Sequence, residues 1–247
     1  MGKILSSSIL FLTMLISLRS VAAVTYLEGD IVGESEITVD ASTSFFEAAT
    51  ASRYGHVGVI IRGKTEWVVY EEYPPKAQIV TLKDFLARSH GTYTVIRRRQ
   101  ALTATQLQQV RASAQDIVKR GVPYNYSQTS NNDSMNCSEF IHSIFAAAQL
   151  QVGKVQTVAD LNLKTFHGYL WKIWQQTSPD TSLKDHVLTP ASVMKTADWS
   201  KIDGSVDPNV PLTDAQLVAQ WKKESALKGI ADEWGVTTQQ IEKMAQP

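Results

Sequence analysis

The sequence contains very little cysteine, because Cys137 is the only one in 247 residues. A single thiol cannot close a disulfide within the chain or form a cysteine-rich zinc site. The histidines and acids lack a metal-binding spacing such as H-E-x-x-H, and the chain has no glycine-rich nucleotide loop. We therefore expect no metal and no nucleotide cofactor.

Long hydrophobic runs are also missing after residue 24, and the only one lies at the N-terminus. Lys3 precedes an apolar run over residues 4–18, and the small residues SVAA follow at 20–23. This pattern predicts a cleaved secretory signal peptide over residues 1–23. An uncleaved anchor is the alternative, but the run is shorter than the roughly 20 residues that a membrane span needs.

The chain has no excess of either charge, with 24 Lys and Arg against 24 Asp and Glu. Removal of residues 1–23 deletes Lys3 and Arg19 but no acid, which leaves 22 basic against 24 acidic residues. A protein of this charge has no field that attracts nucleic acid. We expect an exported protein, periplasmic or secreted, with no nucleic-acid partner and no integral membrane span after cleavage.

Export makes the lone cysteine informative, because thiols in oxidising compartments usually form disulfides. Cys137 is then reactive, paired with another molecule, or an inert buried side chain. The apolar residues that follow it have helical spacing: Phe140, Ile141, Ile144, Phe145 and Ala148. Asn136 is a favoured N-cap, and Glu139 can complete a capping box, so Cys137 is predicted to be the first helical residue. At that position the helix dipole stabilises a thiolate, and the Cys137 amide can bind an oxyanion.

A cysteine nucleophile needs a base, and the chain has five histidines. His142 lies on the same helix as Cys137 but points about 140° away from it. His90, His167 and His186 have neighbours that suggest surface positions. His56 is the remaining candidate.

His56 begins a predicted β-hairpin, because β-branched and aromatic runs flank a polar turn that contains Gly63. If residues 62–65 form a four-residue loop, His56 pairs with Glu71 on the same face of the sheet. Glu71 would then orient the imidazole, while Glu72 would point to the other face. A one-residue slip would exchange the two acids, and a His–Glu pair on a solvated strand face is the alternative interpretation.

Several motifs occur in an order that resembles a known family: GDIV at Gly29, SRYGHVGVII around His56, VVYEE with Glu71, VIRR at Val95, GVPYNY at Gly121, DSMNCSE around Cys137 and LTPASV at Leu188. Over residues 27–195 the chain resembles the YiiX/YebB-like cysteine hydrolases. These are circularly permuted relatives of papain, akin to the NlpC-type cell-wall amidases.

The resemblance implies an α+β, permuted papain-like fold in which an antiparallel sheet packs against helices and the His strand precedes the Cys helix. It also implies a catalytic triad of Cys137, His56 and Glu71. In NlpC-type enzymes a Tyr ahead of the Cys lies near the oxyanion, so Tyr124 is the matching candidate and Tyr126 the second. A core aromatic anchored by its hydroxyl is the alternative for Tyr124.

Outside these motifs, Thr103 and Gln106 predict a capping box at the start of a helix that ends near Gly121 and packs beside the catalytic helix. The aromatic-rich residues 159–175 could line a groove for an apolar substrate or belong to the core. We expect a hydrolase domain over residues 24–202, then a linker and a small helical extension over 203–247.

The extension has the rhythm of a DNA-binding helix-turn-helix. Residues 212–247 carry four lysines against five acids, however, so no basic face is expected. A helical hairpin that docks on the hydrolase or on a partner is the favoured interpretation.

Together these features predict an exported hydrolase that cleaves amide or ester bonds of cell-envelope substrates through an acyl-enzyme intermediate. Peptidoglycan peptides and acylated lipids are the two substrate classes left open. A catalytically inactive envelope-binding module is the alternative, but it would not need the set of Cys137, His56 and Glu71.

Overall fold

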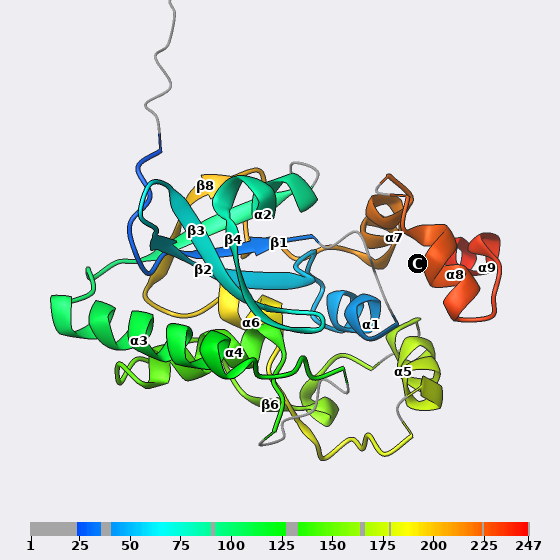
Figure 1. The fold of residues 1–247 in the computed structure, drawn as a ribbon. Helices are drawn as coiled ribbons and strands as arrows, with labels where there is room; N and C mark the ends of the chain where they lie inside the picture. The colour runs from blue at the N-terminus through cyan, green and yellow to red at the C-terminus, as the bar shows by residue number, and fades with distance from the viewer. Residues whose placement is uncertain are drawn as a thin grey trace, which may run out of the picture.

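A computed structural model describes residues 24–35, 41–89, 92–126, 133–163, 166–177, 179–223 and 225–246. The predicted signal peptide, residues 1–23, lies outside the described residues, and so does His90. Figure 1 shows a central sheet with helices on both of its faces and a group of helices at one end.

Among the described residues, six strands form one antiparallel sheet in the order β4-β3-β2-β1-β5-β8. Its strands are β1 (Ile31–Glu34), β2 (His56–Arg62), β3 (Trp67–Tyr73), β4 (Lys76–Thr81), β5 (Tyr93–Arg98) and β8 (Trp199–Gly204). Strands β6 (Gln156–Thr157) and β7 (His186–Val187) form a separate pair. β-branched and aromatic residues fill β2 and β3, as expected for strands buried on both faces.

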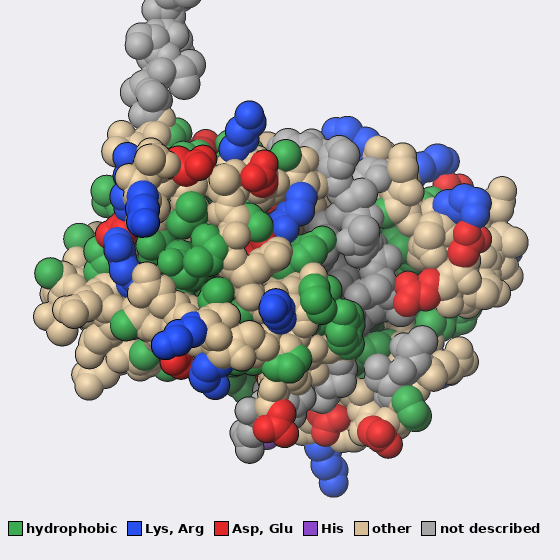
Figure 2. All heavy atoms as spheres, in the orientation of Figure 1, with side chains coloured by type: hydrophobic (Ala, Val, Ile, Leu, Met, Phe, Trp, Pro, Cys, Tyr) green, Lys and Arg blue, Asp and Glu red, His purple; other side chains and the backbone are tan. Residues whose placement is uncertain are grey.

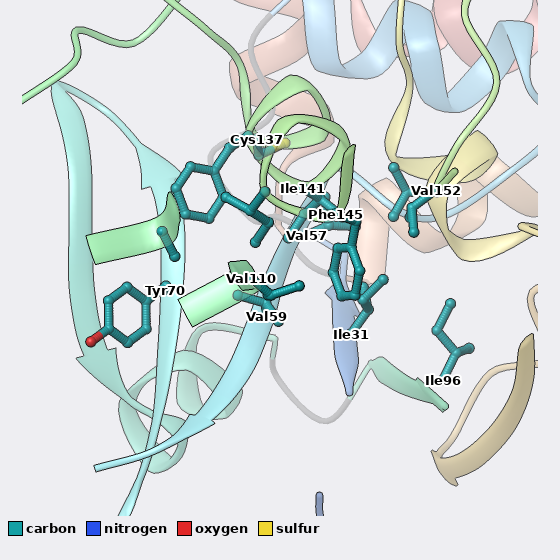
Figure 3. Packing of buried hydrophobic residues seen from close by; sticks show 14 of the residues in the cluster. Ile31, Val57, Val59, Tyr70, Ile96, Val110, Cys137, Ile141, Phe145 and Val152 are labelled. Carbon is teal, nitrogen blue, oxygen red and sulfur yellow. The ribbon is translucent and has the colours of Figure 1, made fainter. Parts of the chain in front are cut away.

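The two faces of the sheet are covered by different helices. One face packs against α3 (Ala104–Arg120), α4 (Cys137–Ala146) and α6 (Pro190–Met194), and the other packs against α2 (Leu82–Arg88). In β2 the side chains of Val57 and Val59 belong to the α4 face, where Figure 3 shows them beside Ile141 and Phe145. Ile60 belongs to the α2 face. This alternation places His56 on the α2 face as well.

The predicted helix beside the catalytic helix is confirmed as α3. Thr103 and Gln106 form the predicted capping box, and Gly121 ends the helix in the left-handed conformation with φ 62°. Val110, Ala114 and Ile117 lie in the same buried cluster as Phe140 and Ile141 of α4.

Helices from both ends of the chain share a second core. The helices are α1 (Ala41–Ala49), α5 (Phe166–Thr177), α7 (Asp214–Lys223), α8 (Leu227–Glu233) and α9 (Thr238–Met244), and the short 3-10 helix η1 (Val158–Asp160) adjoins them. Trp174 of α5 and Trp221 of α7 are almost fully buried in this cluster. Residues 159–175 therefore supply core side chains, and the helical extension docks on α1 and α5 (Figure 1).

Specific polar contacts fix the extension to the rest of the chain. The Trp221 Nε1–H donates to Glu47 Oε2 at 2.6 Å, and the Gln220 side chain donates to Ser35 Oγ at 2.7 Å. His167 Nε2 lies 2.6 Å from Asp214 Oδ1, and His167 is 5% exposed. The prediction that His167 is a surface residue was wrong, because the extension covers it and supplies a carboxylate partner.

The predicted linker also begins later than expected. Asp203 and Gly204 belong to β8, which pairs with β5 at the edge of the sheet. Within the described residues, no helix has both the length and the apolar character that a membrane crossing requires.

Candidate active site

Cys137 is the first residue of α4, as predicted. The Asn136 Oδ1 accepts hydrogen bonds from the amides of Ser138 and Glu139 at 2.9 and 3.0 Å, and Glu139 Oε2 accepts from the Asn136 amide at 2.8 Å. The predicted capping box is therefore confirmed. The Asn136 oxygen binds the second and third amides of the helix and not that of Cys137. Cys137 is buried, with only 3% of the residue exposed.

The β2–β3 hairpin forms, but its predicted register was wrong by two residues. Arg62 pairs with Trp67 and Ile60 with Val69, so the four-residue loop is 63–66, closed by a hydrogen bond from the Gly63 amide to the Glu66 carbonyl at 2.8 Å. The prediction had placed a loop of the same length one residue earlier. A shift of two keeps every side chain on its predicted face.

His56 and Glu71 therefore meet as diagonal neighbours on one face of the sheet. His56 Nε2 lies 2.8 Å from Glu71 Oε2, and the residues are 1% and 0% exposed. Tyr73, which follows on the same face of β3, packs edge-on against the imidazole with the ring centroids 5.3 Å apart. The pair is buried, so the solvated-face interpretation was wrong. With Nε2 at Glu71, Nδ1 is the nitrogen left for another partner.

The Cys137 side chain lies close enough to the imidazole to influence its pKa. Burial by itself lowers the pKa of His56 because it disfavours the imidazolium. The Cys137 side chain and then Glu71 oppose burial and raise the pKa of His56 well above its usual value. Cys137 and Glu71 together therefore favour the protonated form of His56.

Arg88, at the end of α2, makes two hydrogen bonds to Glu71 that the sequence did not reveal. Its guanidinium donates to Glu71 Oε1 at 3.0 Å and to Oε2 at 2.6 Å, and Gln78 Nε2 also donates to Oε1 at 2.9 Å. Burial raises the pKa of Glu71, but His56 and Arg88 outweigh burial and hold it at about 2. Glu71 is thus a fixed carboxylate that orients His56.

A second carboxylate, Glu34, also joins this cluster. Glu34 pairs directly with His56 across β1 and β2, and it is 1% exposed. Arg88 bridges the two acids, because its guanidinium lies 3.2 Å from Glu34 Oε1. Arg88 therefore links Glu34 to Glu71, the carboxylate that orients His56.

Glu72, the neighbour of Glu71, points to the opposite face of β3 as predicted. It is fully buried, and the Glu71 cluster does not include it. Burial raises the pKa of Glu72 to about 8, although a backbone hydrogen bond at Ala77 and the charge of His56 act against this rise. At neutral pH this carboxyl is mainly protonated, so it cannot replace Glu71 as an anionic partner of His56.

Tyr124 lies beside the chain that leads into Cys137. It forms a parallel bridge with Met135, and the Asn125 amide donates to the Met135 carbonyl at 2.9 Å. The Tyr124 side chain is half-buried, outside the hydrophobic clusters, and packs edge-on against Tyr126, which is 60% exposed. The core interpretation of Tyr124 is therefore not supported.

Two other histidines lie away from this cluster. His142 Nδ1 is 2.8 Å from the Val152 carbonyl, and His186 is exposed on β7. Within the described part of the chain, no three His, Cys, Asp or Glu side chains gather in a way that could hold a metal ion.

Comparisons with known proteins agree with this arrangement. Residues 26–203 match the family model of the permuted papain-like amidases, the YaeF/YiiX or C92 peptidase family. The chain is 24% identical over 191 residues to the uncharacterized protein YiiX of Escherichia coli K12, covering 76% of this chain and 91% of YiiX. A crystal structure described as metalloprotein YiiX from Escherichia coli O157:H7 matches with a TM-score of 0.65 and 22% identity, over 73% of this chain and 98% of that one.

The fold is therefore the predicted α+β, permuted papain-like one, with an antiparallel sheet packed against helices. The family match ends at residue 203, so it covers the sheet and the helices on its faces but not α7, α8 and α9. This chain belongs to the permuted papain-like amidase family.

Proposed function

We propose that this protein is an exported cysteine hydrolase in which Cys137 is the nucleophile, His56 the base and Glu71 the residue that orients it. One observation carries the proposal. A buried imidazole lies 2.8 Å from Glu71, and both Glu71 and Cys137, a cysteine at a helix N-terminus, raise its pKa. A purely structural His would not need both an orienting carboxylate and a nearby cysteine.

In the proposed reaction, the Cys137 thiolate attacks a carbonyl carbon and a C–S bond forms. The carbonyl electrons move to oxygen, where the Cys137 amide and the Tyr124 hydroxyl stabilise the oxyanion. The His56 imidazolium then gives its proton to the leaving amine or alcohol as the C–N or C–O bond breaks. His56 next takes a proton from water, which attacks the thioester carbon. The C–S bond then breaks, which releases the acid and restores the Cys137 thiolate.

The substrate is an amide or ester of the cell envelope, either a peptidoglycan peptide or an acylated lipid. The predicted signal peptide supports a periplasmic or secreted location. The E. coli O157:H7 structure is described as a metalloprotein. The described residues of this chain offer no cluster of metal ligands, so the proposal for it uses no metal.

The test is to incubate the purified mature protein with wall-derived peptides and with short acyl esters, and to detect the products by mass spectrometry. Cys137→Ala and His56→Ala should abolish release of product while their circular dichroism spectra stay like that of the wild type. A covalent mass increase on Cys137 during turnover is the expected sign of the acyl-enzyme. Turnover that survives in Cys137→Ala would disprove the proposed role of Cys137.

A further inference from the structure

A large cavity lies at the opposite end of the β2–β3 hairpin from His56. It has a volume of about 610 Å³ and is lined by Arg62 at the end of β2 and by Trp67 at the start of β3. His56 begins β2 and Arg62 ends it, so about 20 Å of strand separates the cavity from the proposed active site. A volume of this size is within the range of sites for one small ligand, about 300–1,000 Å³.

Apolar side chains form much of the cavity wall. Leu27 comes from the segment before β1, Trp67 from β3, Leu102 from the segment before α3 and Leu107 from the first turn of α3. Leu27 is 47% exposed, which leaves an apolar side chain open to solvent. Such a surface gains free energy when a ligand covers it.

The two acids that line the cavity already have basic partners. Asp30 accepts two hydrogen bonds from the Arg97 guanidinium, at 2.8 and 2.7 Å. Glu28 accepts from the Arg62 backbone amide at 2.9 Å and is paired with the Arg111 guanidinium. The carboxylates are therefore neutralised without using the side chain of Arg62.

Three lining guanidinium groups have no carboxylate partner among the described residues: those of Arg62, Arg98 and Arg99. Arg62 stacks on Trp67 with its guanidinium 5.0 Å from the ring centroid, and Arg98 donates to the Gln100 carbonyl at 3.2 Å. Figure 2 shows Lys and Arg side chains gathered beside hydrophobic ones at the edge where the described chain begins. The cavity thus combines apolar walls with an excess of positive charge.

We propose that this cavity binds a single-chain amphiphile with an anionic head, a carboxylate or a phosphate. The apolar chain lies against Leu27, Leu102 and Leu107, and the head contacts the guanidinium groups of Arg62 and Arg99, which present paired donors suited to both anions. The site is separate from the proposed hydrolysis, because a ligand held here lies far from Cys137. The ligand is bound and not cleaved.

The experiment is a calorimetric titration of the purified mature protein with four probes: laurate and dodecyl phosphate below their micelle concentrations, dodecanol below its solubility limit, and acetate. Laurate or dodecyl phosphate should bind one per chain, and the tighter of the two identifies the preferred head. Dodecanol has the apolar chain without the charge. It should bind at least about tenfold more weakly than laurate, because hydrogen bonds to a charged head contribute about that factor to the affinity. Acetate, which has the charge without the chain, should give no saturable signal.

Two variants test the location of the site. The double change Arg62→Gln and Arg99→Gln, at exposed residues, should weaken laurate binding about tenfold or more. Ala101→Trp, which fills the cavity, should also weaken it. Arg120→Gln, on an exposed part of α3 outside the cavity, is the matched control and should bind like the wild type.

Equal binding of laurate and dodecanol, or equal affinities of the double variant and the Arg120→Gln control, would overturn the proposal. A free fatty acid has no bond for the enzyme to hydrolyse. Laurate should therefore bind Cys137→Ala as tightly as the wild type, so failure here is distinguishable from failure of the proposed hydrolase function.

Discussion

His56 and Glu71 form a buried contact of 2.8 Å between Nε2 and Oε2, although they are not directly opposed in the β2–β3 ladder. The contact spans a diagonal of the sheet, which a glutamate side chain is long enough to cross. Arg88 holds the same carboxylate with a hydrogen bond to each of its oxygens. The orientation of the proposed base therefore depends on three elements, β2, β3 and α2.

Glu71→Gln and Glu72→Gln should have very different effects on activity. Glu71→Gln removes the charge that stabilises the imidazolium, so we expect kcat/KM to fall on the order of 10²-fold or more. Glu72 is already mainly neutral, with a pKa of about 8, so its amide should change kcat/KM by less than about threefold at pH 7. Steady-state kinetics with any substrate found in the screen provides the measurement. Equal losses in the two variants would contradict the assignment of Glu71.

Arg88→Met should destabilise the fold as well as the site. It leaves Glu34 and Glu71 buried with one cationic partner fewer, and breaking a buried pair typically costs about 3–5 kcal/mol. Urea unfolding at pH 7 measures the change. Arg120→Met removes an exposed pair with Asp116 and should cost about 0–1 kcal/mol, so similar costs for the two variants would argue against the buried cluster.

Glu72 should make the folded protein less stable as the pH rises. Its pKa is about 8 in the folded chain and 4.5 as the ordinary value, so between these pH values the folded state holds a proton that the unfolded state releases. The free energy of unfolding then decreases with pH across this window. Glu72→Gln removes this pH dependence. The free energy of unfolding of the variant, relative to that of the wild type, should therefore be higher at pH 9 than at pH 5. The exposed change Glu66→Gln should show no such trend.

Trp221→Ala should lower the stability of the whole chain. The side chain is fully buried between the extension and α1, and its loss creates a cavity and removes the hydrogen bond to Glu47 Oε2, at a cost of about 3–5 kcal/mol. We expect the denaturant concentration at the unfolding midpoint, followed by tryptophan fluorescence, to fall. Activity should be lost over the same range of denaturant. The neighbouring exposed change Lys222→Ala is the control. Activity that persists after the extension has unfolded would mean that the extension is an independent module.

Local signals in the sequence predicted the helix ends well. Asn136 with Glu139 and Thr103 with Gln106 form the capping boxes that their spacing indicated, because these contacts need only residues three apart. The face of Glu71 was also predictable, since a four-residue loop placed one position away changes the register by two and preserves the alternation. The register of the hairpin was not predictable, because no residue type in the loop fixed the position of the loop along the chain.

The parts of the site that sequence could not provide are non-local. Glu34 reaches His56 only through the pairing of β1 with β2, and Arg88 reaches Glu71 only because α2 packs across the sheet. His167 was expected at the surface because its partner, Asp214, lies 47 residues away. A buried charge cluster is built from such distant contacts, which a linear pattern does not encode.

The most direct test of the account is the rate at which iodoacetamide alkylates Cys137, measured against pH in the wild type and in His56→Ala. Iodoacetamide is small enough to suit a thiol that is only 3% exposed. If Cys137 and His56 form an ion pair, alkylation of the wild type should persist well below pH 8, whereas the variant should react only above it. A slow rate that rises only above pH 8 in both proteins, with the fold intact, would contradict the account and make Cys137 an inert buried thiol.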